Sequence, residues 1–252
     1  MLRGAFISGG LALAFAVASL LDPRVLPTGE DVWLKPLRFA LAFAVHALTL
    51  AWLWRLADRH PESDRLFDLA CRLQLAVMVV ELACVALQGA RGVPSHFNVA
   101  DPFDAAVFTI MGIGTYGLFI GYAGMALNLL LRPGPSRLID LGILCGLALS
   151  VAGGLVGVAM VAVFNGHGVG PGGGELAFFG WRISGGDLRV PHFVGIHALQ
   201  ALPAIAWLLS RTTALASIRW IGFAGGSSAY LAAFAAILAL ALEGRSVFEI
   251  VR

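Results

Sequence analysis

The chain is short of charge: only 13% of its 252 residues are Asp, Glu, Lys or Arg, where a soluble domain carries about a quarter. Hydrophobic residues make up 59% of the chain, and the mean hydropathy is +0.85. These values exclude an ordinary soluble domain and indicate that most of the surface faces lipid. The net charge of +2, with no block of basic residues, also argues against a nucleic-acid-binding protein.

Cysteines and local catalytic motifs are scarce as well. Cys71, Cys84 and Cys145 lie singly in apolar runs and form no CxxC, so they predict small core residues rather than a disulfide framework. The chain contains no HExxH and no GxSxG. Its glycine-rich stretch at 166–174 lacks the Gly-Lys-Ser/Thr of a phosphate-binding loop and is interpreted as an outer loop around His167. Any chemistry must therefore come from residues that are distant in the sequence.

What the sequence has instead is a series of long apolar runs. Strand-like alternation over about ten residues, the signature of a transmembrane barrel, is absent. A helix needs about 20 residues to cross a hydrocarbon core of ~30 Å, and it satisfies its own backbone groups there. We therefore predict an all-α, polytopic transmembrane helical bundle of about seven spans that forms a single domain over residues 1–252. The predicted helices cover residues 5–21, 36–57, 66–88, 105–131, 138–164, 192–209 and 217–242.

The first of these runs has an alternative interpretation as a signal peptide. It is short, it follows a single arginine, and Ala16-Val17-Ala18 resembles a cleavage site. We expect the run to be retained as the first span. If it is cleaved or lies in the interface, the number of spans becomes six.

Basic residues in the loops predict the orientation. Short connections on one side carry most of the compact basic clusters, and such loops stay in the cytoplasm. We therefore expect the N-terminus inside and, with seven spans, the C-terminus outside. The basic residues of these connections are Arg55, Arg59, Arg65, Arg132, Arg137, Arg211 and Arg219.

Small residues form stripes on two of the predicted helices. In the fourth helix, glycines recur from Gly114 to Gly124 at steps of three and four, and in the fifth they recur from Gly142 to Gly157. Such stripes let helix backbones approach closely in lipid. We expect the two helices to form an antiparallel structural pair, joined by the short turn at residues 132–137; a homo-oligomer interface is the alternative.

Polar residues of the third helix share one face. Gln74, Glu81 and Gln88 are seven residues apart, and seven residues bring a helix back to within about 20°. An ionised side chain cannot face lipid, so this face must point into the bundle. Glu81 is then roughly 10 Å below the end of the helix that carries Gln88.

Two histidines occur at a similar depth on other helices. His46 lies eleven residues beyond Lys35 on nearly the same face, roughly 16 Å from it along the axis. His197 lies five residues past His192, and Gln200 shares its face. Pro203 removes a backbone donor from the carbonyl of Leu199, which predicts a local kink. We therefore predict that His46, Glu81 and His197 converge, with charged and polar residues at the mouth above them. The mouth residues are Lys35, Arg38, Arg91, His96, Asp187, Arg189 and His192.

A metal-dependent enzyme is the first chemistry that this set predicts. Two imidazoles and a carboxylate form a common ligand set for catalytic zinc, with a position left for water. His46, Glu81 and His197 would be ligands. His96, Asp187 or His192 would be a further ligand or a base. The substrate would be lipophilic or amphiphilic, because the site lies at the depth of the outer leaflet.

Two other chemistries stay open. His46 and His197 could be the axial ligands of a b-type haem, whose propionates Lys35, Arg38, Arg91 and Arg189 would bind. Gln200 is a further candidate for binding a cofactor. Alternatively, Glu81, the histidines and the basic rim could bind a small polar or anionic ligand, or relay protons, in an outward-facing pocket of a transporter or sensor.

Structural roles are the simplest alternatives. A lone histidine in a membrane helix is often hydrogen-bonded across the bundle, as His46 would be. Glu81 could pair with Arg91 or Arg38. Asp101 and Asp104 could cap the fourth helix, because acidic residues favour a helix N-terminus.

Three segments carry a resemblance to other proteins. Residues 33–39 read WLKPLRF, residues 90–98 read ARGVPSHFN, and residues 186–200 read GDLRVPHFVGIHALQ. They resemble an uncharacterised group of bacterial polytopic membrane proteins. The resemblance implies a protein of the bacterial cytoplasmic membrane and implies no activity. Seven-span zinc hydrolases of the ceramidase and adiponectin-receptor kind close with HxxxH, whereas His192 and His197 are five residues apart, so no residue is carried over from them.

Overall fold

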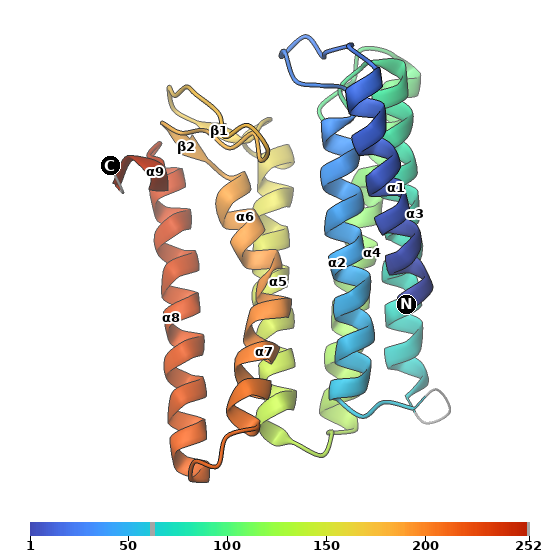
Figure 1. The fold of residues 1–252 in the computed structure, drawn as a ribbon. Helices are drawn as coiled ribbons and strands as arrows, with labels where there is room; N and C mark the ends of the chain where they lie inside the picture. The colour runs from blue at the N-terminus through green and yellow to red at the C-terminus, as the bar shows by residue number, and fades with distance from the viewer. Residues whose placement is uncertain (61–63, 251–252) are drawn as a thin grey trace. The chain divides into compact units, whose positions relative to one another are not determined.

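The chain folds into long helices, and the computed structural model describes residues 1–60 and 64–250. Within these residues, seven helical spans of 20 to 30 residues are apolar enough to cross a membrane, which confirms the predicted all-α bundle (Figure 1). The sixth span consists of two shorter helices. The helices are α1 Leu2–Leu21, α2 Leu34–Leu56, α3 Arg65–Arg91, α4 Pro102–Leu131, α5 Arg137–Ala162, α6 Arg189–Ile196, α7 Ala198–Ser210, α8 Ala216–Leu242 and α9 Val247–Ile250.

Large apolar side chains cover the outside of the spans. Phe6 and Leu20 on α1 are 80% and 85% exposed, and Ile113, Leu130 and Ile221 are exposed on α4 and α8. Water would not tolerate so much contiguous apolar surface, whereas lipid favours it. The chain is therefore a multi-pass membrane protein whose surroundings are the lipid bilayer.

The chain divides into two compact units. The first contains Met1–Arg55 and His60–Met125, and the second contains Leu56–Arg59 and the chain from Ala126 onward. Helices α1 to α3 and most of α4 belong to the first unit, and α5 to α9 belong to the second. The single domain predicted over residues 1–252 stays a prediction.

In the first unit, the glycine stripe of α4 faces α3. A Cβ atom at Gly117 would lie 2.7 Å from Cγ2 of Val77, and one at Gly121 would lie 2.5 Å from Cγ of Gln74. The missing side chains on α4 thus make room for side chains of α3. Gly92 ends α3 with a φ of 71°, a left-handed conformation that glycine adopts without strain, and its N–H bonds to the last turn.

In the second unit, the stripe of α5 faces α6 and α7. A Cβ at Gly142 would lie 2.6 Å from that of Ala206, and one at Gly153 would lie 2.6 Å from the Cα of Gly195. The expected antiparallel pairing of the two helices stays a prediction. The glycines of each stripe pack within their own unit. Those of α4 face α3, and those of α5 face the broken sixth span.

The sixth span is interrupted at His197, two residues before the kink predicted at Leu199. His197 ends α6 and precedes α7. Carbonyl groups in the last turn of α6 bond to other helices: Ser150 Oγ donates to the oxygen of Ile196 at 3.0 Å, and Tyr230 Oη to that of Val194 at 2.7 Å. Two neighbouring helices thus satisfy backbone acceptors at the break, which lipid could not do.

A short antiparallel pair of strands closes the loop before α6. Strand β1 Gly168–Val169 pairs with β2 Gly186–Asp187, with Gly168 opposite Asp187. The glycine-rich stretch predicted as an outer loop thus contains one of the strands. The pairing places Asp187 directly before the first turn of α6.

Candidate functional site

Three polar side chains of α3 are buried along one face. Gln74 and Gln88 are fully buried and Glu81 is 8% exposed, which confirms the shared face that the spacing of seven predicts. A Cβ at Gly114 of α4 would lie 3.2 Å from Oε1 of Glu81. The face therefore points at the glycine stripe of α4.

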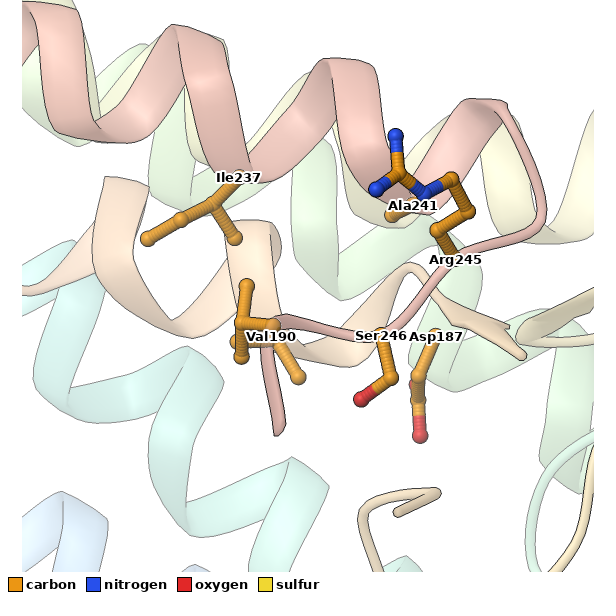
Figure 2. A pocket seen from close by; sticks show the side chains of 7 residues that line it. Asp187, Val190, Ile237, Ala241, Arg245 and Ser246 are labelled. Carbon is orange, nitrogen blue, oxygen red and sulfur yellow. The ribbon is translucent and has the colours of Figure 1, made fainter. Parts of the chain in front are cut away.

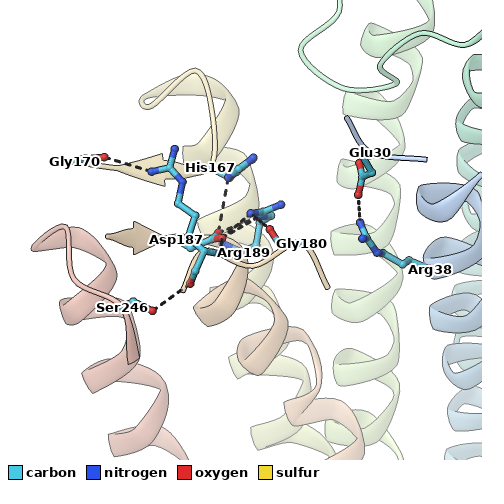
Figure 3. Close-up of polar contacts among 9 residues, drawn as sticks. Glu30, Arg38, His167, Gly170, Gly180, Asp187, Arg189 and Ser246 are labelled. Atoms are coloured by element: carbon cyan, nitrogen blue, oxygen red, sulfur yellow. Dashed lines mark hydrogen bonds and ion pairs between the residues drawn. The ribbon is translucent and has the colours of Figure 1, made fainter. Parts of the chain in front are cut away.

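Glu81 is the least satisfied member of this face. Its Oε2 atom is buried and has no hydrogen-bond partner in residues 1–60 and 64–250. The suggested partners are engaged elsewhere: Arg38 Nη1 lies 2.6 Å from Oε1 of Glu30 (Figure 3), and Arg91 pairs with Asp104. Lys35, at the start of α2, is the cation whose charge acts on Glu81. The pairing of Glu81 with Arg91 or Arg38 is therefore wrong.

His46 forms a hydrogen bond with a neighbouring helix. Its Nε2 atom lies 3.0 Å from Oε1 of Gln74, and the Gln74 amide donates to Sδ of Met125 at 3.1 Å. The ring of Tyr122 lies 6.2 Å away between centroids. This is the structural role that a lone histidine in a membrane helix suggests, and Gln74 fixes the ring through one nitrogen.

A carboxylate network joins the end of α3 to the start of α4. Oδ1 of Asp104 accepts hydrogen bonds from Gln88 Nε2 at 2.9 Å and from Arg91, and Oδ2 accepts one from Asn98 at 2.9 Å. Oδ1 of Asp101 accepts the N–H of Asp104 at 2.8 Å, so Asp101 caps α4 as expected. Asp104 instead binds side chains of α3 and of the loop. The sequence contains a signal for this network, because Gln88 ends the polar face of α3.

His96 lies in this loop among aromatic rings. Its Nδ1 atom is 3.1 Å from Oγ of Ser95. The rings of Phe39 and Phe108 lie 5.8 and 6.0 Å from the imidazole. These contacts fix the position of the ring, and the role of His96 at the mouth of a site stays a prediction.

In the second unit, Asp187 lies at the centre of another network (Figure 3). Arg189 donates to it from Nη2 at 2.7 Å and from Nε, and the backbone N–H of Arg182 donates at 2.9 Å. His167 Nδ1 lies 3.9 Å from Oδ1. Burial raises the pKa of Asp187, but the hydrogen bonds and charge of Arg189 outweigh it and hold the pKa below its ordinary value. Such a carboxylate is a weak base, so the geometry favours a role in holding the loop.

The two histidines of the sixth span each form a hydrogen bond through Nδ1. His192 Nδ1 lies 2.8 Å from the carbonyl oxygen of Gly153 on α5. Because a carbonyl only accepts, this nitrogen carries a hydrogen. His197 Nδ1 lies 3.1 Å from Oε1 of Gln200, and the ring of Phe193 lies 4.1 Å away. An oriented Nδ1 leaves Nε2 as the nitrogen with a lone pair, as in many metal ligands.

The predicted ligands are divided between the units. His46 and Glu81 belong to the first unit and His197 belongs to the second. Across residues 1–60 and 64–250, no group of three or more His, Cys, Asp and Glu side chains is arranged to hold a metal ion. The convergence of these three residues, the zinc enzyme and the haem protein stay predictions, as do the assigned roles of Lys35, Arg38, Arg189 and Gln200.

A small pocket lies in the second unit between the end of α8 and the start of α6 (Figure 2). Its walls are mostly apolar, and Arg245 borders it 3.5 Å from Glu243. The Asp187 carboxylate in its wall is bonded to Arg189. The spacing of the sequence does not predict this pocket, because its residues come from β2, α6, α8, α9 and the connection between α8 and α9. The lining residues are Asp187, Val190, Ile237, Ala241, Arg245, Ser246 and Val247.

Comparison with known proteins gives no relative from which a role can be taken. No family model, no curated protein and no solved structure matches the chain.

Proposed function

We propose that this protein is a transporter that binds a small polar or anionic ligand and couples its movement to protonation of Glu81. The observation that carries the proposal is the buried Oε2 atom of Glu81, which lacks a hydrogen-bond partner in the described part of the chain. An ionised carboxylate in this state is costly in a membrane-spanning helix. A proton on Oε2, or a ligand that donates to it, removes the cost.

Lys35 supplies the coupling between proton and ligand. Its charge acts favourably on ionised Glu81. When Glu81 takes up a proton, that interaction is lost, and an anionic ligand restores a negative charge beside Lys35. Proton binding and anion binding then favour each other, because linkage between two sites is reciprocal.

Close packing gives the site its selectivity. The glycine stripe of α4 leaves room for the Glu81 carboxyl, since a Cβ atom at Gly114 would lie only 3.2 Å from its Oε1. Bulky ligands are excluded from this interface, whereas a proton or a small polar group fits.

The membrane and the orientation belong to the same proposal. The basic short loops support an N-terminus in the cytoplasm and a C-terminus outside. The resemblance of residues 33–39, 90–98 and 186–200 supports the bacterial cytoplasmic membrane. Glu81 would then take up its proton from the outer side, where Gln88 and Arg91 end α3.

The test uses protein reconstituted in liposomes that contain a pH-sensitive dye. Inorganic phosphate or sulfate is added outside, and protein-free liposomes give the background. We expect at least one anion to acidify the interior in the wild type and Glu81→Gln to abolish this. Asp68→Asn is the matched control, because it removes a half-buried carboxyl of the same helix that forms an ion pair with Arg72 at 2.7 Å. Equal proton movement in Glu81→Gln and wild type would overturn the proposal.

A further inference from the structure

A buried polar cluster in the second unit surrounds the turn between α4 and α5. Arg59, Asn128 and Asp140 are each 6% exposed or less. Arg59 donates from Nε to the carbonyl of Ala57 at 2.7 Å, and from Nη1 to the carbonyl of Arg132 at 2.7 Å and to Asn128 Oδ1 at 3.2 Å. The guanidinium thus ties residues 57–59 to the end of α4.

Asp140, in the first turn of α5, is only half satisfied by this cluster. Its Oδ2 atom accepts the N–H of Gly134 at 2.8 Å, which is an ordinary structural role at a helix start. Its Oδ1 atom is buried and has no hydrogen-bond partner in residues 1–60 and 64–250. The structural role therefore explains one oxygen and leaves the other unexplained.

Three groups surround the same side of Gly134. The point where a Cβ of Gly134 would stand lies 2.8 Å from Asp140 Oδ1, 3.1 Å from the oxygen of Ala57 and 3.2 Å from Nη2 of Arg59. Asp140 Oδ1 and the oxygen of Ala57 can only accept a hydrogen bond when Asp140 is ionised. A proton on Oδ1 turns this oxygen into a donor.

We propose that Asp140 is a second proton-binding site, separate from Glu81, whose charge controls how tightly Arg59 holds the turn between α4 and α5. With Asp140 ionised, the carboxylate attracts the guanidinium. With one proton taken from water, the attraction falls, and Oδ1 becomes a donor. The charged groups that act on Asp140 are Arg59 from the preceding connection and Arg137 from its own helix.

Each unit thus holds one carboxyl group with a buried, unpartnered oxygen in a predicted span: Glu81 on α3 and Asp140 on α5. The inference rests on the proposed function only if Asp140 and Glu81 bind their protons in one transport cycle. Proton binding at Asp140 does not require Glu81 to bind one.

Infrared difference spectra between acidic and neutral pH test the two carboxyls separately, on the full chain in lipid. We expect Asp140→Asn to lose one carbonyl-stretch band of a protonated carboxyl that Glu81→Gln retains. Asp68→Asn, which changes a carboxyl on α3 that is paired with Arg72, should retain it too. An Asp140→Asn spectrum identical to that of the wild type would overturn the inference, whatever Glu81→Gln shows.

A second variant covers the case in which Asp140→Asn does not fold. Asp140→Glu keeps an ionisable group but moves it by one methylene toward Arg59. We expect the same band to shift in frequency. An unshifted band assigns the signal to another carboxyl, and it would likewise overturn the inference.

Discussion

The two units use the same device, a glycine stripe, against different neighbours. In the first unit, Gly117 and Gly121 of α4 meet the side chains of Val77 and Gln74. In the second unit, Gly153 of α5 meets the backbone of Gly195. A side chain can move by rotation, whereas a helix backbone cannot move without its whole helix. The first interface can therefore adjust, and the second is rigid.

The two kinds of interface therefore differ in the polar groups that they can hold. Where glycines face side chains, the space they leave can hold an amide or a carboxyl, as it does for Gln74 and Glu81. Where the backbones of α5 and α6 touch, side chains of Ser150, Tyr230 and His192 bond to backbone carbonyl groups. We infer that the interface of α4 with α3 suits the exchange of protons or ligands at Glu81, and that the interface of α5 with α6 holds a broken helix in place.

The largest effect that tests this comparison is expected at Gly153. In Gly153→Ala, the new methyl would lie 2.6 Å from the Cα of Gly195 and the nitrogen of Ile196, and neither atom can rotate away. We expect a loss of about 3 kcal/mol, the upper end for overpacking. Thermal unfolding in mild detergent measures it. Gly225→Ala is the control in the same unit, because its Cβ would meet nothing within 4 Å. Equal unfolding temperatures for the two variants would show that the α5 interface is not rigid.

A smaller effect is expected at Asp187, which holds the loop before α6. In Asp187→Asn the charge is lost, and Arg189 keeps a neutral partner, so we expect about 2 kcal/mol of destabilisation at neutral pH. The folded pKa of Asp187 lies below its unfolded value of about 3.9. The stabilisation is thus complete above about pH 4 and disappears as the pH falls through the folded pKa.

Unfolding temperatures of wild type and Asp187→Asn should therefore converge on acidification. The control is Glu243→Gln, which breaks the exposed pair with Arg245 and should change stability by less than about 1 kcal/mol at any pH. A constant difference between wild type and Asp187→Asn from neutral to acidic pH would mean that the charge of Asp187 does not stabilise the loop.

The fold was predictable from the sequence, and its internal pairing was not. Apolar run length identifies a span because the thickness of the bilayer sets the number of residues. Every predicted helix therefore has an observed counterpart with similar ends. The glycine stripes predicted close packing, but one helix does not reveal its neighbour. The break at His197 depends on Ser150 and Tyr230, which lie on other helices.

The candidate site shows the same limit. The period of seven correctly predicted that Gln74, Glu81 and Gln88 share a buried face, since helix geometry alone determines it. The spacing within one helix does not predict hydrogen-bond partners on other elements. Gln74 binds His46, and Asp104 binds Arg91. Asp140 was missed altogether, because its place in the first turn of α5 suggests only a helix cap. Its unpartnered oxygen appears only when the turn at Gly134 is seen in space.

The smallest effect is expected at Gly117, where the first unit should show its tolerance. In Gly117→Ala the new methyl would lie 2.7 Å from Cγ2 of Val77, one rotatable bond from the α3 backbone. Alanine favours a helix over glycine by about 1 kcal/mol, which offsets the cost of moving Val77. We expect a net change within about 1 kcal/mol in the same thermal measurement, well below that of Gly153→Ala. If Gly117→Ala destabilises as much as Gly153→Ala, both interfaces are rigid, and an adjustable site around Glu81 loses its structural basis.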